Sequence, residues 1–484
     1  MHRRAFLKST LGVVGATLAL PPLRVLGAND DIRVAIIGIG NKGKSHVQTF
    51  QKMPGARLVA LCDVDPKRLQ GQLDKINEKG KGNLPLAVSD PRRVIESKEI
   101  DAVVIATPNH WHSLLARWAV RAGKDVYVEK PVSHNIWEGA KLVDEAKAAG
   151  RVVQAGTQYR SCKGLCAARA WLQEGQVGKL QWAHVLWYEY REAIGKCAPF
   201  TPTDVDYNLW CGPAPLEPLT RPKLHYDWHW VWPTGDGDLG NSGIHAYDSC
   251  RWFIGEPGIP RKAMSLGGRF TYDDAAQTPN TQFTLLDFGH SVPVFIENRN
   301  LSMEKGEKIM DQVRRTREGF ILQYEGGYFA GLRNGGVVYD NNGTRLKEFP
   351  GDGGLDHAPN FIQAVRDRRP DALNAPIREG HISSAVCHLG NISYRLGKPG
   401  SKQACQEALG NRPQVPEAFG RLVSSLKGIG VDLDKTPFTL GPWLEVEPAT
   451  GEILGVAGND KRQLELARKL ARGQYREPFS MPTV

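Results

Sequence analysis

Two short stretches of the sequence hold side chains suited to acid–base chemistry. In DVYVEKPVS, residues 125–133, an apolar strand-like run leads directly into Glu129, Lys130 and Pro131. The sheet holds the end of a buried strand rigid, so a side chain there can be fixed with its tip in a crevice. A lysine so placed stabilises negative charge that develops on a reacting oxygen. The alternative is a surface turn closed by an ion pair.

The second stretch is HYDWHWVWPTGDGDLGNSGIHAYDSCRW, residues 225–252. His245 and Asp248 lie three apart in what reads as an opening helix, so they share one helical face. A histidine there can act as a base or serve as a hydrogen-bonded structural residue. The alternating Trp228, Trp230 and Trp232 either stack on sugar rings or belong to the core.

The elements that position Lys130 begin with IRVAIIGIGNKGKSH. An apolar run, Ile32 to Ile37, precedes Gly38, Gly40 and Gly43, and a polar helix start follows. Glycines in this G-x-G-x-x-G spacing permit a tight turn and close approach of the backbone to a pyrophosphate. The stretch therefore predicts a dinucleotide site.

A second strand, residues 57–62, ends in Asp63, which lies 20 residues after Gly43. An acid at this position binds both ribose hydroxyls and repels a 2′-phosphate, which favours NAD over NADP. Lys67 and Arg68 lie nearby and can grip a phosphate, so NADP remains the less favoured alternative.

Strands and helices then alternate along the chain. Strands are predicted at 102–106 and 152–155 on either side of the 125–133 stretch, and helices at 111–122 and 135–149. This rhythm indicates a parallel, doubly wound sheet. The strand ends carry GIGNKG, CDVD, TPNHWH, EKP and GTQYR, which must converge on one edge of the sheet. Lys130 is thus predicted at the rim of a cofactor crevice.

The second half of the chain has a different pattern. Strand-like segments occupy 180–190, 282–288 and 293–299, Asn342-Gly343 marks a hairpin within 336–349, and helices are predicted to be fewer. Residues 194–222 are rich in proline and glycine and predict a long excursion that borders the site. A helix is predicted at 461–472, ended by Gly473.

Four motifs in the first half of the chain together resemble a known family. In order, they are GIGNKG, CDVD, TPNHWH and EKP. The family is that of glucose-fructose oxidoreductase, inositol dehydrogenase and rhizopine-catabolism proteins, called Gfo/Idh/MocA. The resemblance covers essentially the whole chain after the N-terminal segment. The longer motifs TPNHWH, VEKPVSHN and QAGTQ resemble those of the exported bacterial members of this family. The resemblance implies an NAD(P)-dependent oxidoreductase acting on sugars or polyols, and assembly into dimers or tetramers.

The implied fold class is α/β, with a Rossmann doubly wound parallel sheet followed by a C-terminal α+β domain that has an open, mainly antiparallel sheet. The predicted domains are a signal peptide at 1–28, an NAD(P)-binding domain at 31–158, a substrate and oligomerisation domain at 159–445, and a C-terminal helix and tail at 446–484.

The resemblance also implies roles for individual residues. Lys130 and His245 would be catalytic, with the histidine taking a hydroxyl proton. Cofactor contacts are predicted for Gly38, Gly40, Asn41, Gly43, Asp63, Thr107, Asn109, His112, Glu129 and Gln158, and substrate contacts for Arg160, Trp228, His229, Asn241 and Asp248. No metal is predicted.

One position departs from the family pattern. Family members carry an acid four residues before the histidine, where this chain has Asn241. An amide can orient His245 but supplies no charge, which puts the basicity of His245 in doubt. Asp248 is the candidate to compensate.

The N-terminus, MHRRAFLKSTLGVVGATLAL, has the pattern of a twin-arginine export signal, with Arg3 and Arg4 before a weakly apolar stretch. The apolar stretch is too short to span a bilayer, which needs about 20 residues. The alternative is a basic tail. We expect a periplasmic protein without a transmembrane segment.

Charge and cysteine usage narrow the function classes. Removal of residues 1–28 lowers the formal net charge from +10 to +6, and basic residues are mixed with acids without an aromatic-basic array, so a nucleic-acid partner is not predicted. The eight cysteines, Cys62, Cys162, Cys166, Cys197, Cys211, Cys250, Cys387 and Cys405, show no CxxC pair and no zinc spacing. One or two disulfides remain open.

Export favours a tightly held cofactor, because a periplasm offers little free NAD. Three functions stay open. The first is an NAD-dependent sugar or polyol oxidoreductase. The second is a redox-neutral glycosidase or lyase that retains NAD and oxidises the sugar transiently. The third is a carbohydrate-binding member without turnover, motivated by Asn241.

Overall fold

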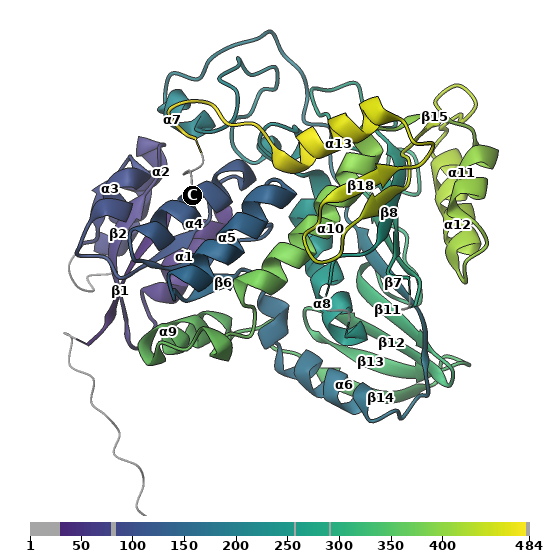
Figure 1. Ribbon diagram of the computed structural model, residues 1–484, viewed down its shortest axis with the longest axis horizontal. Coiled ribbons are helices and arrows are strands. Elements are labelled where there is room, and N and C mark those ends of the chain that lie inside the picture. The colour runs from purple at the N-terminus through teal and green to yellow at the C-terminus, as the bar shows by residue number, and fades with distance from the viewer. Residues whose placement is uncertain (1–29, 79–83, 256–257, 290–291, 481–484) are drawn as a thin grey trace, which may run out of the picture.

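The computed structural model describes residues 30–78, 84–255, 258–289 and 292–480, and the predicted signal at 1–28 lies outside them. Two sheets, each with its own helices, stand side by side (Figure 1). The first has six strands in the order β3-β2-β1-β4-β5-β6, and its paired strands are parallel. This is the predicted doubly wound Rossmann sheet.

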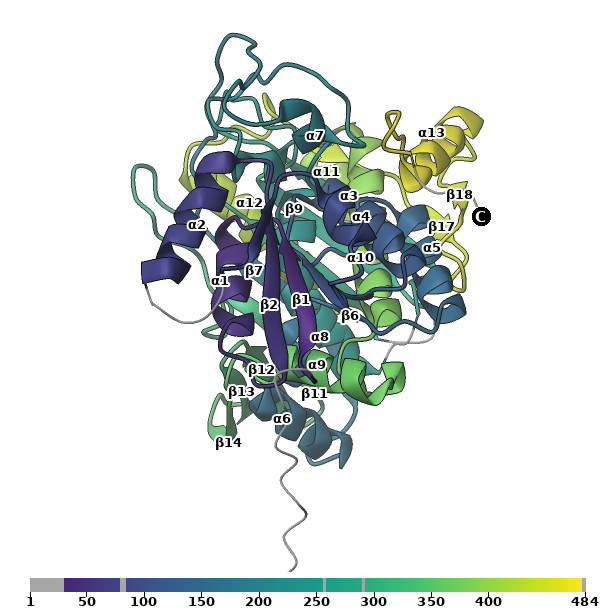
Figure 2. The same cartoon turned by 90° about the vertical axis from the view of Figure 1, so that its left-hand side faces the viewer.

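The strands of the first sheet are β1 (Ile32–Ile37), β2 (Ala56–Cys62), β3 (Leu86–Val88), β4 (Ala102–Ile105), β5 (Asp125–Val128) and β6 (Val153–Ala155). Its helices are α1 (Asn41–Phe50), α2 (Pro66–Glu78), α3 (Pro91–Glu96), α4 (Asn109–Arg121) and α5 (Ile136–Ala148). Every residue of β4 and β5 is buried, because helices cover both faces (Figure 2).

The second sheet has twelve strands in the order β14-β13-β12-β11-β7-β10-β9-β8-β16-β15, with β17 and β18 attached at β8. Its long central strands are β7 (Leu180–Tyr188), β8 (Lys262–Gly268), β9 (Thr281–Asp287), β10 (Val294–Arg299) and β11 (Glu318–Tyr324). The remaining strands are β12 (Gly327–Leu332), β13 (Gly335–Asp340), β14 (Arg345–Pro350), β15 (Lys398–Gly400), β16 (Phe438–Leu440), β17 (Leu444–Val446) and β18 (Ile453–Val456). Pairing is antiparallel except between β7 and β10, as expected for a mainly antiparallel sheet.

The expectation of few helices in the second half is wrong. The described residues there form α6 (Lys163–Gln173), α7 (Tyr207–Cys211), α8 (Ile244–Ile254), α9 (His357–Asp367), α10 (Ile377–Arg395), α11 (Lys402–Leu409), α12 (Val415–Gly428) and α13 (Lys461–Arg472). Helix α10 is buried on nearly all sides and includes buried serines, glycines and histidines. It therefore lacks the alternation of polar and apolar faces by which a surface helix is recognised.

Both faces of the second sheet are covered. Helices α8 and α10 pack on one face with Val185 and Ile296, while α11 and α12 pack on the other with Leu186, Phe283 and Phe295.

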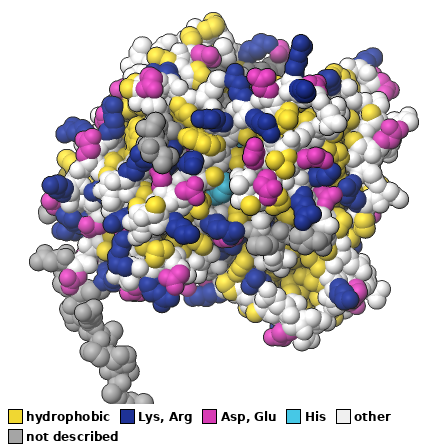
Figure 3. Space-filling model, viewed as in Figure 1, with side chains coloured by type: hydrophobic (Ala, Val, Ile, Leu, Met, Phe, Trp, Pro, Cys, Tyr) yellow, Lys and Arg dark blue, Asp and Glu magenta, His cyan; other side chains and the backbone are white. Residues whose placement is uncertain are grey.

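Figure 3 shows basic and acidic side chains interspersed over one surface of the molecule.

Helix α9 lies far along the chain but packs on the first sheet. Phe361, Ile362 and Val365 share a buried cluster with Val34 and Val104 of β1 and β4. Residues within the range 159–445 thus complete the core of the nucleotide-binding half.

Three smaller findings concern the described residues. None of their helices is long and apolar enough to cross a membrane. No group of three or more histidine, cysteine or acidic residues among them is arranged to hold a metal ion. All eight cysteines are free thiols, so the structure contains neither of the disulfides that the sequence left open.

Candidate functional site

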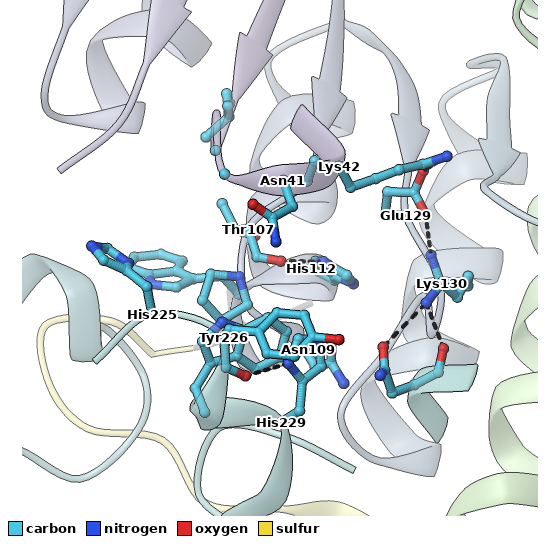
Figure 4. A pocket seen from close by; sticks show the side chains of 18 of the residues that line it. Asn41, Lys42, Thr107, Asn109, His112, Glu129, Lys130, His225, Tyr226 and His229 are labelled. Atoms are coloured by element: carbon cyan, nitrogen blue, oxygen red, sulfur yellow. Dashed lines mark hydrogen bonds and ion pairs between the residues drawn. The ribbon is translucent and has the colours of Figure 1, made fainter. Parts of the chain in front are cut away.

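A cavity of about 490 Å³ lies at the carboxyl ends of the Rossmann strands, where the two halves of the chain meet. Its lining includes most of the predicted residues: Gly38, Gly40, Asn41, Asp63, Thr107, Asn109, His112, Glu129, Lys130, Gln158, Trp228, His229, Asn241 and His245. In Figure 4, Asn41, Lys42 and Thr107 face Tyr226 and His229 across this space. Ligands of doubly wound sheets bind at this edge.

The glycine loop is tightly folded. Gly38 has a φ of +84°, and a Cβ on Gly43 would lie only 2.0 Å from the carbonyl oxygen of Gly38. Helix α1 follows at once, and no side chain caps its first N–H groups. Uncapped N–H groups at a helix start bind phosphate oxygens, so the loop fits a pyrophosphate.

Asp63 directly follows β2, at one end of the pocket. Its carboxylate accepts hydrogen bonds from the backbone N–H groups of Ile39, at 2.9 Å, and Asp65, at 3.0 Å. Burial nevertheless raises the pKa of Asp63. Arg68, the candidate phosphate ligand, is paired with Asp65 at 3.2 Å. Asp63 and Arg68 both line the pocket at this end.

Two predicted cofactor contacts present unpaired polar atoms. Thr107 Oγ1 and Gln158 Oε1 are buried and have no hydrogen-bond partner. His112 differs, since its ring nitrogens lie 2.6 Å from the Pro131 carbonyl oxygen and 2.8 Å from that of Thr107. His112 therefore braces the strand ends, and Asn109 is held by a 2.9 Å hydrogen bond from its Nδ2 to Asp236.

Glu129 anchors a charged cluster on the Rossmann wall of the pocket. His46 Nε2 lies 2.8 Å and Lys42 Nζ 3.5 Å from its Oε1. Burial opposes ionisation, yet Lys42 and His46 hold the pKa of Glu129 well below its usual range. The side chain is a buried anion at neutral pH.

Lys130 projects from the next position toward the second domain (Figure 4). Its Nζ donates to the backbone oxygen of Asn241 at 2.5 Å, and the Asn241 Oδ1 lies at 3.4 Å. Burial lowers the pKa of Lys130 to about 8. Asn241, expected to orient His245, instead contacts the lysine.

His245 lies in the first turn of α8, and its ring centroid is 5.2 Å from that of Tyr159 and 6.4 Å from that of Trp187. Its Nδ1 is buried and has no hydrogen-bond partner. Burial, and then the positive charge of Lys130, hold the pKa of His245 well below its usual range. A neutral imidazole with a free nitrogen can accept a proton.

Two predicted substrate contacts are contradicted. Arg160 donates to both carboxylate oxygens of Asp248, at 2.7 and 2.9 Å, and Ser383 Oγ donates to Asp248 at 2.6 Å. Neither Arg160 nor Asp248 lines the pocket. One turn along α8 is enough to move Asp248 from the pocket to the interface with α10, so it cannot compensate for Asn241.

The three tryptophans lie in different environments. Trp228 lines the pocket and stacks on His229, with ring centroids 3.6 Å apart. Trp230 is buried, and Trp232 packs against Arg395 at 5.0 Å. Only Trp228 is placed to stack on a ligand, while burial lowers the pKa of His229 to about 3 and keeps it neutral.

Sequence reasoning missed a group at the end of β7. Trp187, Glu189 and Arg191 alternate along the chain and line the same wall. Arg191 pairs with Glu189 at 2.7 Å and with Asp238 at 3.3 Å. Period-two spacing in a strand places such residues on one face, which is the signal that would have found them.

Comparison with known proteins identifies the class. Residues 32–157 match the family model described as "Oxidoreductase family, NAD-binding Rossmann fold", and residues 175–284 match its "C-terminal alpha/beta domain". Both matched regions belong to the Gfo/Idh/MocA oxidoreductase family, and the predicted NAD-binding Rossmann fold is confirmed.

Relatives with curated names match parts of the chain. Inositol 2-dehydrogenase of Rubrobacter xylanophilus is 29% identical over 231 residues, covering 48% of this chain and 54% of that protein. Glycosyl hydrolase family 109 protein 2 of Shewanella sp. (strain ANA-3) is 38% identical over 126 residues, covering 25% and 27%. The matched stretches thus span about a quarter to a half of these relatives.

Solved structures share the fold at low sequence identity. The WlbA dehydrogenase from Bordetella pertussis, in complex with NADH and UDP-GlcNAcA, has a TM-score of 0.55 at 21% identity, covering 75% of this chain and 97% of that one. Aldose-aldose oxidoreductase from Caulobacter crescentus has a TM-score of 0.53 at 16% identity, covering 74% and 95%.

Proposed function

We propose that the protein is an NAD-dependent oxidoreductase that acts on a CH–OH group of a sugar or polyol and retains its cofactor between turnovers. One observation carries the proposal. Lys130 and His245, whose buried Nδ1 has no hydrogen-bond partner, line the same pocket as the glycine loop. A proton acceptor and a hydrogen-bond donor for one oxygen are what alcohol oxidation needs.

The residues present fit NAD. The Gly38 to Gly43 loop and the start of α1 suit the pyrophosphate, Asp63 suits a ribose, and the unpaired Thr107 Oγ1 and Gln158 Oε1 offer further polar contacts. Bound NAD supplies the hydride acceptor.

The protein residues act on the hydroxyl. His245, neutral at pH 7, takes the hydroxyl proton on its imidazole ring. Lys130 donates a hydrogen bond to the same oxygen as negative charge develops, since its ammonium has a third donor beyond the two that face Asn241. Tyr159, Trp187 and Trp228 form apolar walls that exclude water.

The sugar or polyol class is supported by the half-buried ring of Trp228, which lines the pocket, and by a relative named inositol 2-dehydrogenase. A second function is favoured by the relatives named glycosyl hydrolase family 109. In that case the same two residues would oxidise a glycoside transiently, and the cofactor would return to its starting state.

The proposal extends to the setting of the enzyme. The twin-arginine pattern at Arg3 and Arg4 supports a periplasmic location, to which a folded protein would be exported with its cofactor inside. A dimer or tetramer is also proposed, and light scattering that gave a monomer at micromolar concentration would contradict it.

The deciding experiment is mass spectrometry of the cofactor released when the purified protein is denatured, followed by two assays. Stoichiometric NAD or NADH after dialysis, with sugar oxidation, supports the proposal. Cleavage of a glycoside without added cofactor would select the second function. A protein that binds neither NAD nor NADH would leave a carbohydrate-binding role and overturn the proposal.

A further inference from the structure

Residues 204–225, here called the lid, cross the pocket near Asp63. Within the lid, Tyr207, Trp210 and Leu219 form a small buried cluster of their own. Leu209, Trp210 and His225 line the pocket, so the lid is one of its walls. The sequence predicted an excursion here that borders the site, and Figure 2 shows its helix α7 near the ends of the Rossmann strands.

On one side the lid is joined to the loop after β2. The Asp206 N–H lies 3.4 Å from the carbonyl oxygen of Val64, and His225 Nε2 lies 2.9 Å from Asp65 Oδ2. Both contacts lie beside Asp63, the ribose residue.

On the other side the lid rests on the start of α4. Trp111 Nε1 donates to the Trp210 carbonyl oxygen at 3.1 Å, and His110 Nε2 lies 3.1 Å from the same oxygen. Gly212, with a φ of +50°, sits so close that a Cβ there would lie 2.1 Å from the Trp111 ring. The lid therefore spans the pocket from rim to rim.

A second segment fastens the lid from outside. Residues 473–480, here called the strap, follow α13 and run back to α7, as the yellow end of the chain shows in Figure 1. The strap is anchored on the Rossmann half, where the Tyr475 hydroxyl donates to Glu138 at 2.8 Å. Phe479 is 2% exposed, and its ring centroid lies 5.5 Å from that of Trp111.

Arg476 ties the strap to the lid. Its backbone N–H donates to Pro213 at 3.0 Å, and its Nε donates to the Ala214 carbonyl oxygen at 3.2 Å. Its Nη1 and Nη2 donate to the side chain and backbone oxygens of Asn208, at 2.8 and 2.9 Å. One guanidinium thus holds both ends of α7, although the strap itself does not line the pocket.

We propose that the strap locks the lid across the adenosine end of the pocket, so that bound NAD leaves only when the lid opens. This inference rests on the proposed function, because it assumes that NAD binds here. The lid has contacts on both rims, and opening it requires breaking those contacts together with the hydrogen bonds of Arg476. The lid held closed by the strap, here called the latch, makes the cofactor a retained group rather than an exchanging substrate.

The test is the dissociation rate of NADH, followed by its fluorescence after dilution into excess NAD. In Arg476→Ala, loss of three side-chain hydrogen bonds from a charged donor should raise the rate by about 10-fold or more. Arg462→Ala is the matched control, since Arg462 is exposed on α13 and no hydrogen bond of its side chain is seen among the described residues. Its dissociation rate should equal that of the parent protein.

Hydrogen exchange gives a second readout without activity. Amides of residues 204–225 should exchange faster in Arg476→Ala, and the rest of the pocket should be unchanged. If Arg476→Ala does not fold, Tyr475→Phe removes only the hydroxyl contacts of the strap and should raise the NADH dissociation rate by about 3-fold.

The outcomes separate the two proposals. An unchanged dissociation rate in a folded Arg476→Ala, or in Tyr475→Phe if that variant is needed, overturns the latch and leaves the proposed function standing. Release of NADH from the parent protein within one turnover does the same. A parent protein that binds no NAD overturns both.

Discussion

Two buried glutamates in this molecule have similar neighbours but different positions. Glu129 lies 2.8 Å from His46, and Glu297 lies 3.1 Å from His184. Each carboxylate also faces a cation, Lys42 at 3.5 Å for Glu129 and Arg299 at 2.5 Å for Glu297. Despite burial, the cationic neighbours lower the pKa of both, that of Glu297 to about 2.

The two glutamates differ in whether a ligand can reach them. Glu129 lines the pocket and precedes Lys130, whereas Glu297 is fully buried on the far face of the second sheet, close to Arg421 of α12. A buried histidine–glutamate pair is therefore no sign of catalysis by itself, and only its place at a strand end beside a cavity gives it a chemical use.

The sharpest test of this contrast is Lys130→Met. Loss of the hydrogen bond to the developing oxyanion should lower the rate of hydride transfer by roughly 10³-fold while NAD remains bound. Single-turnover absorbance of NADH measures the rate, and Lys147→Met, at an exposed lysine on α5, is the control. An unchanged rate would remove Lys130 from the mechanism.

Glu297→Ala should act on stability. Without the carboxylate, the buried guanidinium of Arg299 keeps Asp311 as its one acidic partner among the described residues, and unfolding in urea should need about 3 kcal/mol less free energy. NAD affinity of the folded variant should not change, which calorimetry can check. A loss of affinity with unchanged stability would reverse the roles assigned to the two glutamates.

The dependence of kcat/KM on pH tests the charge of Lys130, which lies beside Glu129 at the pocket. Because the pKa of Lys130 is about 8, its positive charge is lost as the pH rises through that value, and kcat/KM should fall about tenfold per unit above it. His245, with its pKa well below the usual range, stays neutral across this interval. A profile flat to pH 10 would show that the charge of Lys130 is not needed.

The smallest effect is expected from Glu129→Gln. The negative charge of Glu129 raises the pKa of Lys130, so its removal should move the alkaline limb of the profile to lower pH. The same limb in Glu297→Gln should stay in place. Equal shifts in the two variants would mean that the limb does not report on Lys130.

The Rossmann wall of the pocket was predictable because its signals are local. A glycine loop, Asp63 and Lys130 each follow a strand, and parallel strands bring their ends to one edge. The other wall is assembled from distant segments. Nothing local in Arg476 shows that it binds Asn208, 268 residues earlier.

The incorrect predictions for Asp248 and Asn241 also arise from contacts between distant segments. Helical spacing placed His245 and Asp248 on one face, but the packing of α10 decided which of them meets the pocket. Likewise, Asn241 was assigned to His245 from a family pattern, whereas the π-helical turn at Leu239–Gly243 brings its backbone oxygen to Lys130. Tertiary packing overrides what periodicity alone can indicate.

Helix α9 links the two halves in a way that bears on cooperativity. Because Phe361 and Val365 complete the core around Val34 and Val104, the nucleotide-binding half reaches its full core only when residues more than 250 positions later have docked. Contacts of such sequence separation close late in folding. The two halves should therefore melt in one calorimetric transition, and residues 31–158 alone should expose the apolar surface that α9 covers.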